Sequence, residues 1–342
     1  MKRILEFKNS PKIVHTATIC GPKEAQGNLG KYIDKHLNDD YNNEKNFERA
    51  ERKMLLYAIK SVIEKSKKSL DEIDLYIGGD LLNQIISSSF CAREFSLPFL
   101  GVYTACATMA ESMIIGASLV DSGIINNCVC ATCSHFSTAE RQYRFPLEQG
   151  TTRPPQSQWT VTGAGANMIS ISNTGVSIKR ALVGRVIDYG VTDVNNMGAA
   201  MAPAAADTII RHLADFGRQP DYYDAIITGD LGRYGKSLLK YILSKEGIKL
   251  PDTYMDAGAG YFKPEQQTFQ GGSGAGCISS VFNGYILNQL ESGALGKILV
   301  VPTGALLNKD TPLQKETIPG ISHAFVVETE KIKKSILKTL KI

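Results

Sequence analysis

The sequence predicts an α/β protein made of two halves, each of which repeats one unit of helix, turn and strand. Residues 71–81 (Asp-Glu-Ile-Asp-Leu-Tyr-Ile-Gly-Gly-Asp-Leu) recur at 221–231 (Asp-Tyr-Tyr-Asp-Ala-Ile-Ile-Thr-Gly-Asp-Leu), an offset of 150. An amphipathic helix precedes each copy, over residues 47–67 and 198–216. Strands that alternate with helices pair in parallel, so we expect two βαβαβ halves that form a layered α-β-α-β-α body.

A second helix and strand follow in each half. One helix opens at Cys106 and leads to a strand at 127–132, and the other opens at Gly276 and leads to a strand at 297–302, an offset of 170. The larger offset predicts an insertion near 232–269, which belongs on a rim. We therefore divide the chain into halves at 1–175 and 176–342, the second with this insertion and a basic tail. The short apolar runs expected to form central strands are 73–77, 225–227 and 298–301.

Composition limits the classes of function. A chain of 342 residues with 43% hydrophobic and 21% charged residues can bury a large core. The net charge of +4, from 38 Lys and Arg against 34 Asp and Glu, is too balanced and scattered for a nucleic-acid surface. Seven cysteines, an odd number without the spacing of a disulfide scaffold, predict reduced thiols and a reducing compartment. We expect no signal peptide, and no apolar stretch approaches the roughly 18 residues of a membrane span.

Cys106 is the residue that best indicates chemistry. It follows the apolar segment 97–102 and precedes a helix rich in small residues, so its thiol lies at a strand-to-helix turn. The unpaired N–H groups and the positive end of the helix dipole favour a thiolate or a bound anion there. The alternative is a buried structural cysteine.

Two other patterns predict no site. Cys128, Cys130, Cys133 and His135 offer four metal ligands within eight residues, but the offset of 170 aligns the three cysteines with residues 298, 300 and 303, which we expect to be a buried strand and its exit. A strand directs Cys128 and Cys130 to one face, where they do not converge with the other two. The glycine-rich segments at 163–165 and 271–276 lack the Gly-Lys-Ser/Thr ending of a phosphate loop. We expect neither a metal nor a cofactor.

The cysteine at the head of a buried helix, the repeated halves and the glycine-rich turn at 271–276 resemble the thiolase and ketoacyl synthase superfamily. The sequence also resembles, more narrowly, the stage V sporulation protein AD family, over about residues 6–330. The motifs that carry this resemblance are at 21–24 (Gly-Pro-Lys-Glu), 29–32, 134–135, 140–146, 154–155, 158–166 and 318–324 (Ile-Pro-Gly-Ile-Ser-His-Ala). The resemblance implies a thiolase-like fold.

The superfamily's condensing enzymes pair the cysteine with a His and an Asn, or with two His, from the second half. Here Gly229 stands where the resemblance places the His, and the turn at 270–273 (Gln-Gly-Gly-Ser) lacks the Asn. One such donor is worth roughly 3–4 kcal/mol in the transition state, so we expect a protein that is not an enzyme. Two alternatives remain open: an active acyl or ketoacyl transferase in which His135 or His323 pairs with Cys106, and a structural scaffold.

The resemblance implies a protein that binds dipicolinic acid (pyridine-2,6-dicarboxylate), free or as its calcium chelate, for uptake into or release from bacterial spores. A planar dianion favours a helix N-terminus, forked arginine donors and a flat wall. The candidate ligand-binding residues are Thr104, Cys106, His135, Arg141, Arg144, Arg153, Trp159 and His323, with Tyr143 as a second candidate wall. For each arginine the alternative is a surface ion pair, and for the tryptophan a place in the core.

The same resemblance implies a homodimer, other proteins of a spore membrane channel complex as partners, and a peripheral location at the forespore or spore inner membrane. The tail at 331–342 holds five lysines, with four apolar residues at helical spacing. This pattern predicts either contact with an anionic membrane surface or a solvated terminal helix.

Overall fold

A long hydrogen-bonded sheet runs through the computed structural model, which describes residues 4–143 and 152–329. Its main path has the order β11-β10-β13-β16-β9-β2-β8-β6-β4-β5. The strands of the first half are β2 (Lys12–Cys20), β4 (Leu75–Gly79), β5 (Phe99–Gly101), β6 (Asn127–Ser134) and β8 (Gly163–Ser170). Those of the second half are β9 (Val176–Leu182), β10 (Ala225–Thr228), β11 (Met255–Asp256), β13 (Lys297–Val301) and β16 (Ala324–Glu328).

The two series of five strands have the same order and the same pairing. β4 pairs in parallel with β5 and β6, and β10 pairs in parallel with β11 and β13. Antiparallel pairing follows in both series, from β6 through β8 to β2 and from β13 through β16 to β9. The series meet where Ile13 of β2 pairs with Val176 of β9. The short strand β1 (Ile4–Glu6) pairs with β9 along the edge opposite β16, the same edge that β2 contacts, with Ile4 opposite Leu182.

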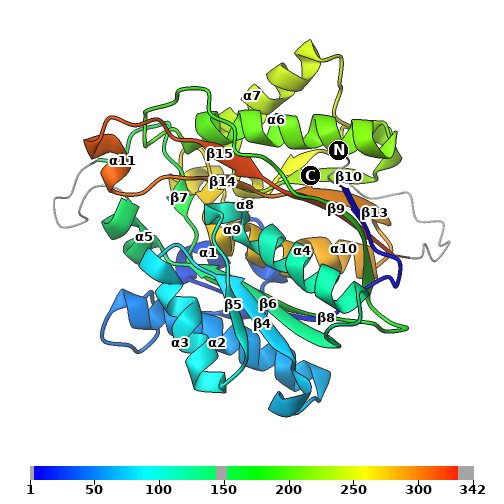
Figure 1. Cartoon of the computed structure of the whole chain (residues 1–342). Helices are drawn as coiled ribbons and strands as arrows, with labels where there is room; N and C mark the ends of the chain where they lie inside the picture. Colours follow the sequence, from blue (N-terminus) through cyan, green and yellow to red (C-terminus); the bar gives the residue numbers. More distant parts are fainter. Residues whose placement is uncertain (1–3, 144–151, 330–342) are drawn as a thin grey trace.

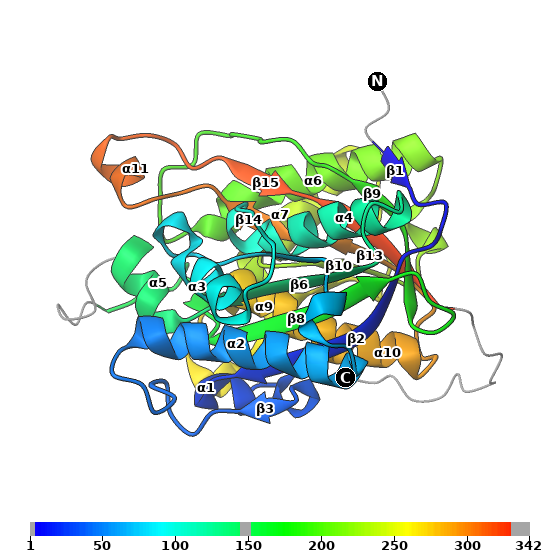
Figure 2. The ribbon, with the colours of Figure 1, turned by 60° about the horizontal axis from the view of Figure 1, so that its bottom comes forward.

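The molecule has five layers, in which three layers of helices alternate with the two halves of the sheet, as predicted (Figure 1). The sheet folds at the junction of its two halves, so that the halves lie one above the other with helices between them (Figure 2). The outer helices are α2 (Phe47–Ser66) and α3 (Ile86–Phe95) on one side and α6 (Met197–Phe216) and α7 (Gly232–Lys245) on the other. The middle layer contains α4 (Thr108–Asp121), α9 (Ala275–Val281) and α10 (Leu287–Glu291). A hydrophobic core fills each space between helices and sheet.

The aspartates that recur in the sequence hold neighbouring parallel strands together. Asp74 accepts the N–H groups of Asn126 and Asn127, both at 2.8 Å, where β6 begins. Asp224 does the same in the second half, accepting the N–H groups of Gly296 at 2.8 Å and Lys297 at 2.9 Å. The repeated aspartate therefore satisfies the backbone donors at the start of the adjacent strand.

Small residues allow the middle helices to lie close to the sheet. A Cβ atom on Gly116 of α4 would stand 3.0 Å from Cys130 Sγ and 3.1 Å from Cys128 Sγ, both on β6. All seven cysteines are buried, and none of them forms a disulfide.

The local structure departs from the sequence prediction in three places. Residues 70–72 form a 3₁₀ turn, so the strand expected from Ile73 begins at Leu75. The helix expected to open at Cys106 begins with a 3₁₀ turn (Ala105–Ala107). The second central helix contains a π-helical turn (Phe282–Ile286) between α9 and α10. In the region of the predicted insertion, residues 232–269 form α7, β11 and the short helix α8 (Ala257–Tyr261).

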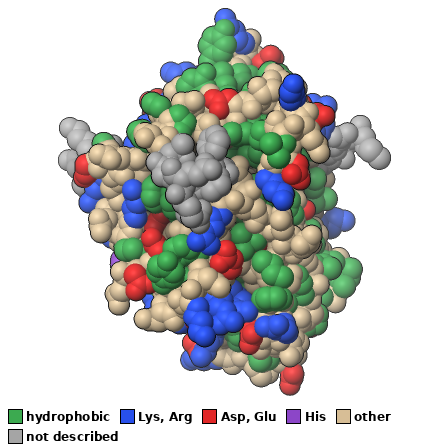
Figure 3. Space-filling model, turned by 90° about the vertical axis from the view of Figure 1, so that its left-hand side faces the viewer, with side chains coloured by type: hydrophobic (Ala, Val, Ile, Leu, Met, Phe, Trp, Pro, Cys, Tyr) green, Lys and Arg blue, Asp and Glu red, His purple; other side chains and the backbone are tan. Residues whose placement is uncertain are grey.

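The basic tail lies outside the described residues. Among the helices of the described part of the chain, none has the length and apolar character needed to span a bilayer. The face in Figure 3 carries basic and acidic side chains interspersed, with one group of basic side chains near its lower edge.

Candidate functional site

Cys106 follows a turn with an unusual backbone. Ala105 has φ of 52°, in the left-handed region that costs a residue with a Cβ atom roughly 1–2 kcal/mol. Thr108 holds this turn, because its hydroxyl accepts the Thr104 N–H at 3.1 Å and donates to the Ala105 carbonyl at 2.6 Å. Such backbone conformations persist where the surroundings fix them, often at functional sites. The turn places the Cys106 thiol at the head of α4.

The start of α9 faces this turn from the second half of the chain. Ser134 on β6 accepts the Gly276 N–H at 3.0 Å and donates to the Val161 carbonyl at 2.7 Å. Just before α9 lies the short strand β12 (Gly272–Ser273), which pairs with β7 (Trp159–Thr160). As a result, Ser273 Oγ lies 3.8 Å from Cys106 Sγ, so a hydroxyl and a thiol meet where the two halves join.

Two adjoining pockets lie on the outer side of this contact. The inner pocket, over Cys106, has a volume of about 40 Å³, which is room for roughly two or three water molecules. It is lined by Leu81, Tyr103, Ala105, Cys106, Ala139, Tyr143, Thr160, Met197, Ser273, Ala305 and Leu307. The outer pocket has a volume of about 400 Å³. It is lined by Leu82, Asn83, Gln84, Ile85, Gly101, Val102, Tyr103, Tyr143, Leu306, Leu307, Asn308 and Thr311.

The backbone leaves little space at the position where the resemblance places the catalytic histidine. A Cβ atom on Gly229 would stand 3.1 Å from the Cα of Pro302 and 3.2 Å from the Thr303 nitrogen. Gln270, in the turn that lacks the asparagine, accepts the Tyr234 N–H at 2.9 Å and donates to the Pro155 carbonyl at 2.8 Å. From this turn it is therefore Ser273 whose side chain contacts Cys106.

His135 directs both ring nitrogens away from Cys106. Its Nε2 donates to the Asp40 carbonyl at 2.8 Å, and its Nδ1 accepts the Ser137 N–H at 3.2 Å. Its ring lies 5.2 Å from the ring of Phe47. Burial lowers the pKa of His135, so the ring is neutral at pH 7.

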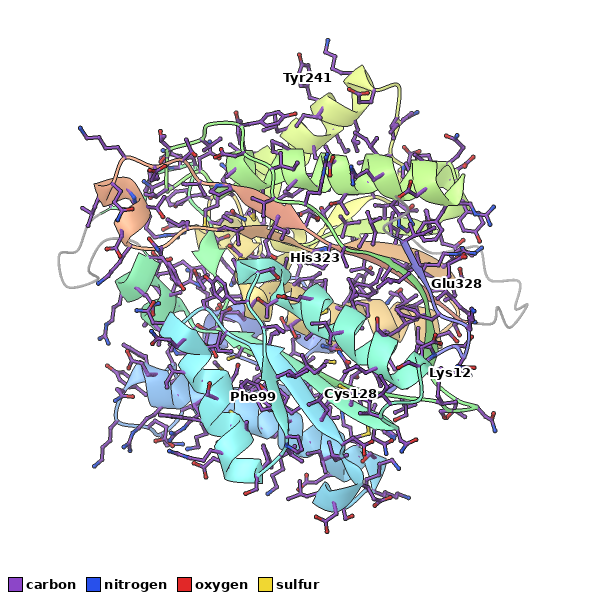
Figure 4. The ribbon with its side chains drawn as sticks, viewed as in Figure 1. Lys12, Phe99, Cys128, Tyr241, His323 and Glu328 are labelled. Carbon is purple, nitrogen blue, oxygen red and sulfur yellow. The ribbon has the colours of Figure 1, made fainter. Side chains whose placement is uncertain are left out.

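His323 lies between β15 (Gly320–Ser322) and β16, near the middle of the molecule (Figure 4). Its Nδ1 accepts the Gly184 N–H at 3.1 Å, and its buried Nε2 has no hydrogen-bond partner among the described residues. Burial lowers the pKa of His323 to about 4. Neither of the two candidate histidines forms a hydrogen bond with the Cys106 sulfur.

The candidate arginines that the structure describes do not line the two pockets. Arg141 lies on α5 (Phe136–Tyr143), with its guanidinium 3.5 Å from the Glu48 carboxylate and 5.3 Å from the ring of Phe47. Arg153 donates to the Gln158 carbonyl, and its guanidinium lies 5.0 Å from the Trp159 ring. Arg144 lies outside the described residues.

Trp159 and Thr104 are engaged in packing and hydrogen bonding. The Trp159 ring stacks on Phe136 at 3.6 Å, Lys23 Nζ lies 3.8 Å from it, and its N–H donates to Glu24 at 3.2 Å. Burial raises the pKa of Glu24 to about 7. Thr104 donates its hydroxyl to Glu111 at 3.0 Å. Of the predicted residues that are described, Cys106 lines the pocket, together with the alternative wall Tyr143.

Ser273 and Tyr103, which both line the inner pocket, are not among the residues predicted from the sequence. Ser273 carried a usable signal, because it is the one hydroxyl in the glycine-rich run at 271–276. Tyr103, three residues before Cys106, had no signal in a single sequence. Asp230 is buried beside the thiol of Cys277, on the helix that follows Ser273. Burial and the neighbouring Asp256 raise the pKa of Asp230 well above its usual range.

The cysteines of β6 do not converge on a common point. Cys128 and Cys130 share one face, with their sulfurs 3.9 Å apart, whereas the Cys133 thiol donates to Glu51 at 3.5 Å. Within residues 4–143 and 152–329, no three His, Cys, Asp or Glu side chains are placed to hold a metal ion.

The sequence of this chain matches a known protein family, and its structure matches a known fold. Residues 1–328 match the family model described as Stage V sporulation protein AD (SpoVAD). The chain is 43% identical over 319 residues to Stage V sporulation protein AD of Bacillus subtilis (strain 168), covering 93% of this chain and 94% of the relative.

Several solved structures share the fold at low sequence identity. The 3-oxoacyl-[acyl-carrier-protein] synthase III of Aquifex aeolicus VF5 is 14% identical with a TM-score of 0.57, over 93% of this chain and 100% of that one. A variant of Xanthomonas campestris OleA, with bound lauric acid and lauroyl-CoA, is 14% identical with a TM-score of 0.60, over 94% and 99%. An acetyl-CoA acetyltransferase from Syntrophomonas wolfei is 11% identical with a TM-score of 0.58, over 93% and 99%. The chain therefore has a thiolase-like fold, as the sequence predicts.

Proposed function

The chain belongs to the stage V sporulation protein AD family, and on this premise we propose that it binds dipicolinic acid, free or as its calcium chelate, without catalysing a reaction. In this proposal the protein serves the uptake of dipicolinate into spores or its release from them. The proposal places the ligand in the pockets beside Cys106.

The surroundings of the Cys106 thiol are the main support for a protein that binds its ligand without catalysing a reaction. The two histidines that could activate a substrate carbonyl direct their ring nitrogens elsewhere or bury them unpaired. A hydroxyl, Ser273, contacts the sulfur instead. A neutral hydroxyl is a weaker donor than the preorganised groups that stabilise an oxyanion, which supports a binding role for this pocket.

The size and lining of the outer pocket support a small planar ligand. A volume of about 400 Å³ accommodates a pyridine ring with two carboxylates, whereas the inner pocket does not in its present shape. The side-chain amides of Asn83 and Asn308 offer N–H donors to carboxylate oxygens, and leucine, isoleucine and valine supply apolar walls.

Calorimetric titration with dipicolinate tests this proposal. We expect saturable binding that weakens about tenfold in Asn308→Leu, through the loss of one hydrogen bond to a charged group. Cys106→Ala should also weaken it, whereas Arg141→Ala, whose side chain pairs with Glu48, should bind like the wild type. Titrations with and without calcium, and with benzene-1,3-dicarboxylate, which lacks the chelating ring nitrogen, separate the free acid from the chelate. No saturable binding at millimolar dipicolinate would overturn the proposal in favour of a scaffold.

A second candidate function is acyl or ketoacyl transfer through Cys106. It is favoured by the turn at Ala105, which fixes the thiol at a helix start beside a pocket. Intact-mass measurement after incubation with acyl-CoA decides between the two. A thioester adduct that is absent in Cys106→Ala would establish transfer, and an unmodified wild-type chain would support the binding role.

We further propose a peripheral location at the forespore or spore inner membrane, in contact with proteins of a channel complex. Flotation with anionic liposomes of the full chain and of a chain ending at residue 330 tests the contribution of the basic tail. Flotation that requires the tail supports direct membrane contact. Equal behaviour of the two chains indicates that partner proteins provide the attachment.

A further inference from the structure

We infer that Tyr103 and Tyr143 form a partition that divides the ligand site into two chambers. The ligand rests in the outer chamber, and until the partition opens it admits small molecules to Cys106 far more readily than larger ones. The inference rests on the proposed function for the identity of the ligand, but not for the existence of the partition.

The partition is defined by the residues that the two pockets share. Tyr103, Tyr143 and Leu307 line both of them. The two tyrosine hydroxyls lie 3.3 Å apart, and the Tyr143 hydroxyl donates to the Leu81 carbonyl. Because Tyr143 gives its proton to Leu81, it accepts the proton of Tyr103. A chain of two hydrogen bonds therefore runs between the chambers, from Tyr103 before α4 through Tyr143 at the end of α5 to Leu81 after β4.

Asn83, in the wall of the outer chamber, is linked to Tyr143 through Gln142. Gln142 Nε2 donates to Asn83 Oδ1 at 2.7 Å and contacts the Tyr143 hydroxyl at 3.4 Å. A carboxylate ligand would accept from Asn83 Nδ2 while Asn83 Oδ1 still accepts from Gln142, so that the ligand, Asn83, Gln142 and Tyr143 form one chain of contacts. Binding in the outer chamber is thereby connected to the position of Tyr143.

The backbone around the partition is held in fixed, strained conformations. Gln84 and Ile85 in the outer wall have φ of 54° and 48°, and a β-branched residue such as Ile85 rarely adopts this region. The Ile85 Cδ1 occupies the place of a side chain at Gly101, since a Cβ atom there would stand 2.3 Å from it. With the walls fixed by close packing, the two tyrosine side chains are the parts that can rotate.

The partition can open without a change in the charge of either tyrosine. Burial, as the first cause, raises the pKa of both Tyr103 and Tyr143, so both hydroxyls keep their protons at physiological pH. Opening requires the loss of hydrogen bonds between neutral groups, which contribute little compared with ion pairs. Tyr103 is 41% exposed, so its ring can move outward into the outer chamber.

Covalent modification of Cys106 by thiol reagents of two sizes tests the partition. The rates with methyl methanethiosulfonate and with N-ethylmaleimide are measured by peptide mass spectrometry, with Cys106→Ser as the blank for the other six buried cysteines. Relative to the rate of each reagent with free cysteine, we expect the wild type to react far more slowly with the larger reagent. Tyr143→Ala should raise the maleimide rate about tenfold or more, because opening no longer limits access, and should change the rate of the small reagent much less.

Two variants control for general loosening of the fold. Tyr143→Phe keeps the ring and loses the hydroxyl, so it should give an intermediate maleimide rate even if the alanine variant folds poorly. Tyr241→Ala removes a tyrosine that is 58% exposed on α7 and should leave both rates unchanged. Equal reactivity of the wild type toward both reagents, or an unchanged ratio in both Tyr143 variants, would overturn the partition.

Adding dipicolinate separates this inference from the proposed function. Saturating dipicolinate should slow the maleimide reaction of Tyr143→Ala, because the ligand occupies the chamber through which the reagent passes. Size selectivity that persists without any effect of dipicolinate would support the partition and contradict dipicolinate as the ligand. Protection by dipicolinate without size selectivity would support the ligand and contradict the partition.

Discussion

Glu51 on α2 shows how one buried side chain links stability to pH. Its carboxyl accepts the Thr138 hydroxyl at 2.6 Å and the Cys133 thiol at 3.5 Å. Burial, reinforced by the neighbouring Asp80, raises the pKa of Glu51 to about 8. The folded protein therefore keeps this carboxyl protonated at neutral pH, whereas the unfolded chain ionises it near pH 4.5.

Stability should accordingly fall as pH rises. The contribution of the neutral Glu51 carboxyl to the free energy of unfolding is fully present below pH 4.5 and is lost as the pH approaches 8. The pKa values of Glu24 and Asp256, raised to about 7 and about 6, change the stability in the same direction. Urea unfolding between about pH 5 and pH 8.5 should show a decline, and Glu51→Gln should reduce its slope because the amide does not titrate. Identical slopes in the two proteins would show that Glu51 ionises freely in the folded state.

Single residues also mark the limit of prediction at the site. The position of Cys106 followed from the sequence because a thiol between an apolar strand and a helix has one place in an α/β layer. The orientation of His135 did not, because it depends on the Asp40 carbonyl, which lies far away in the sequence. The same holds for Arg141, whose partner Glu48 belongs to another helix.

Among the secondary-structure elements, α9 depends most on close backbone approach. A Cβ atom on Gly276 would stand 2.3 Å from the Gly163 carbonyl and 2.8 Å from the Ser134 hydroxyl. This helix meets β8 and β6 without room for a methyl group. The approach sets the position of Ser273 and so the contact with Cys106.

Gly276→Ala should therefore destabilise the protein by about 3 kcal/mol, the range expected for overpacking against a rigid backbone. The matched control is Gly260→Ala in α8, where the nearest atom would be 4.0 Å away and alanine favours the helix. Chemical denaturation measures both variants. If the two glycines tolerate alanine equally, α9 does not require the close contact described above.

Periodicity predicted the long elements well. The bounds of α2 and α6 differ from the expected ranges by one residue, because an apolar stripe every three or four residues defines a helix face. The π-helical turn between α9 and α10 gave no such signal, because it inserts one residue into an otherwise regular pattern. The 3₁₀ turn at 70–72 depends on a capping interaction between Ser69 and Glu72 that short-range patterns describe poorly.

For the molecule as a whole, β5 forms one edge of the sheet. Its Leu100 is 45% exposed, and an uncovered edge strand with an apolar side chain favours pairing with another chain. The outer pocket includes Gly101 of the same strand. The homodimer implied by the family resemblance therefore has a suitable surface next to the proposed ligand site.

Leu100→Lys should shift a dimer to monomers, because it places a charge in the pairing edge. Sedimentation velocity of both proteins measures the change. Leu313→Lys, which alters a leucine that is 80% exposed and belongs to no strand of the sheet, should leave the association state unchanged. A wild-type chain that sediments as a monomer at high concentration would refute the dimer.

The pairing of β1 with β9 has a consequence for how the protein is made. Ile4 can pair only after Leu182 has been synthesised. In the same way, both edges of β2 are paired only after β8 has been synthesised. Contacts this distant in the chain form slowly, so the early segment must remain unpaired while more than half of the protein is translated. The apolar side chains of this segment stay exposed during that interval. A chaperone that binds nascent chains should therefore reduce aggregation most before the strands of the second half have been synthesised.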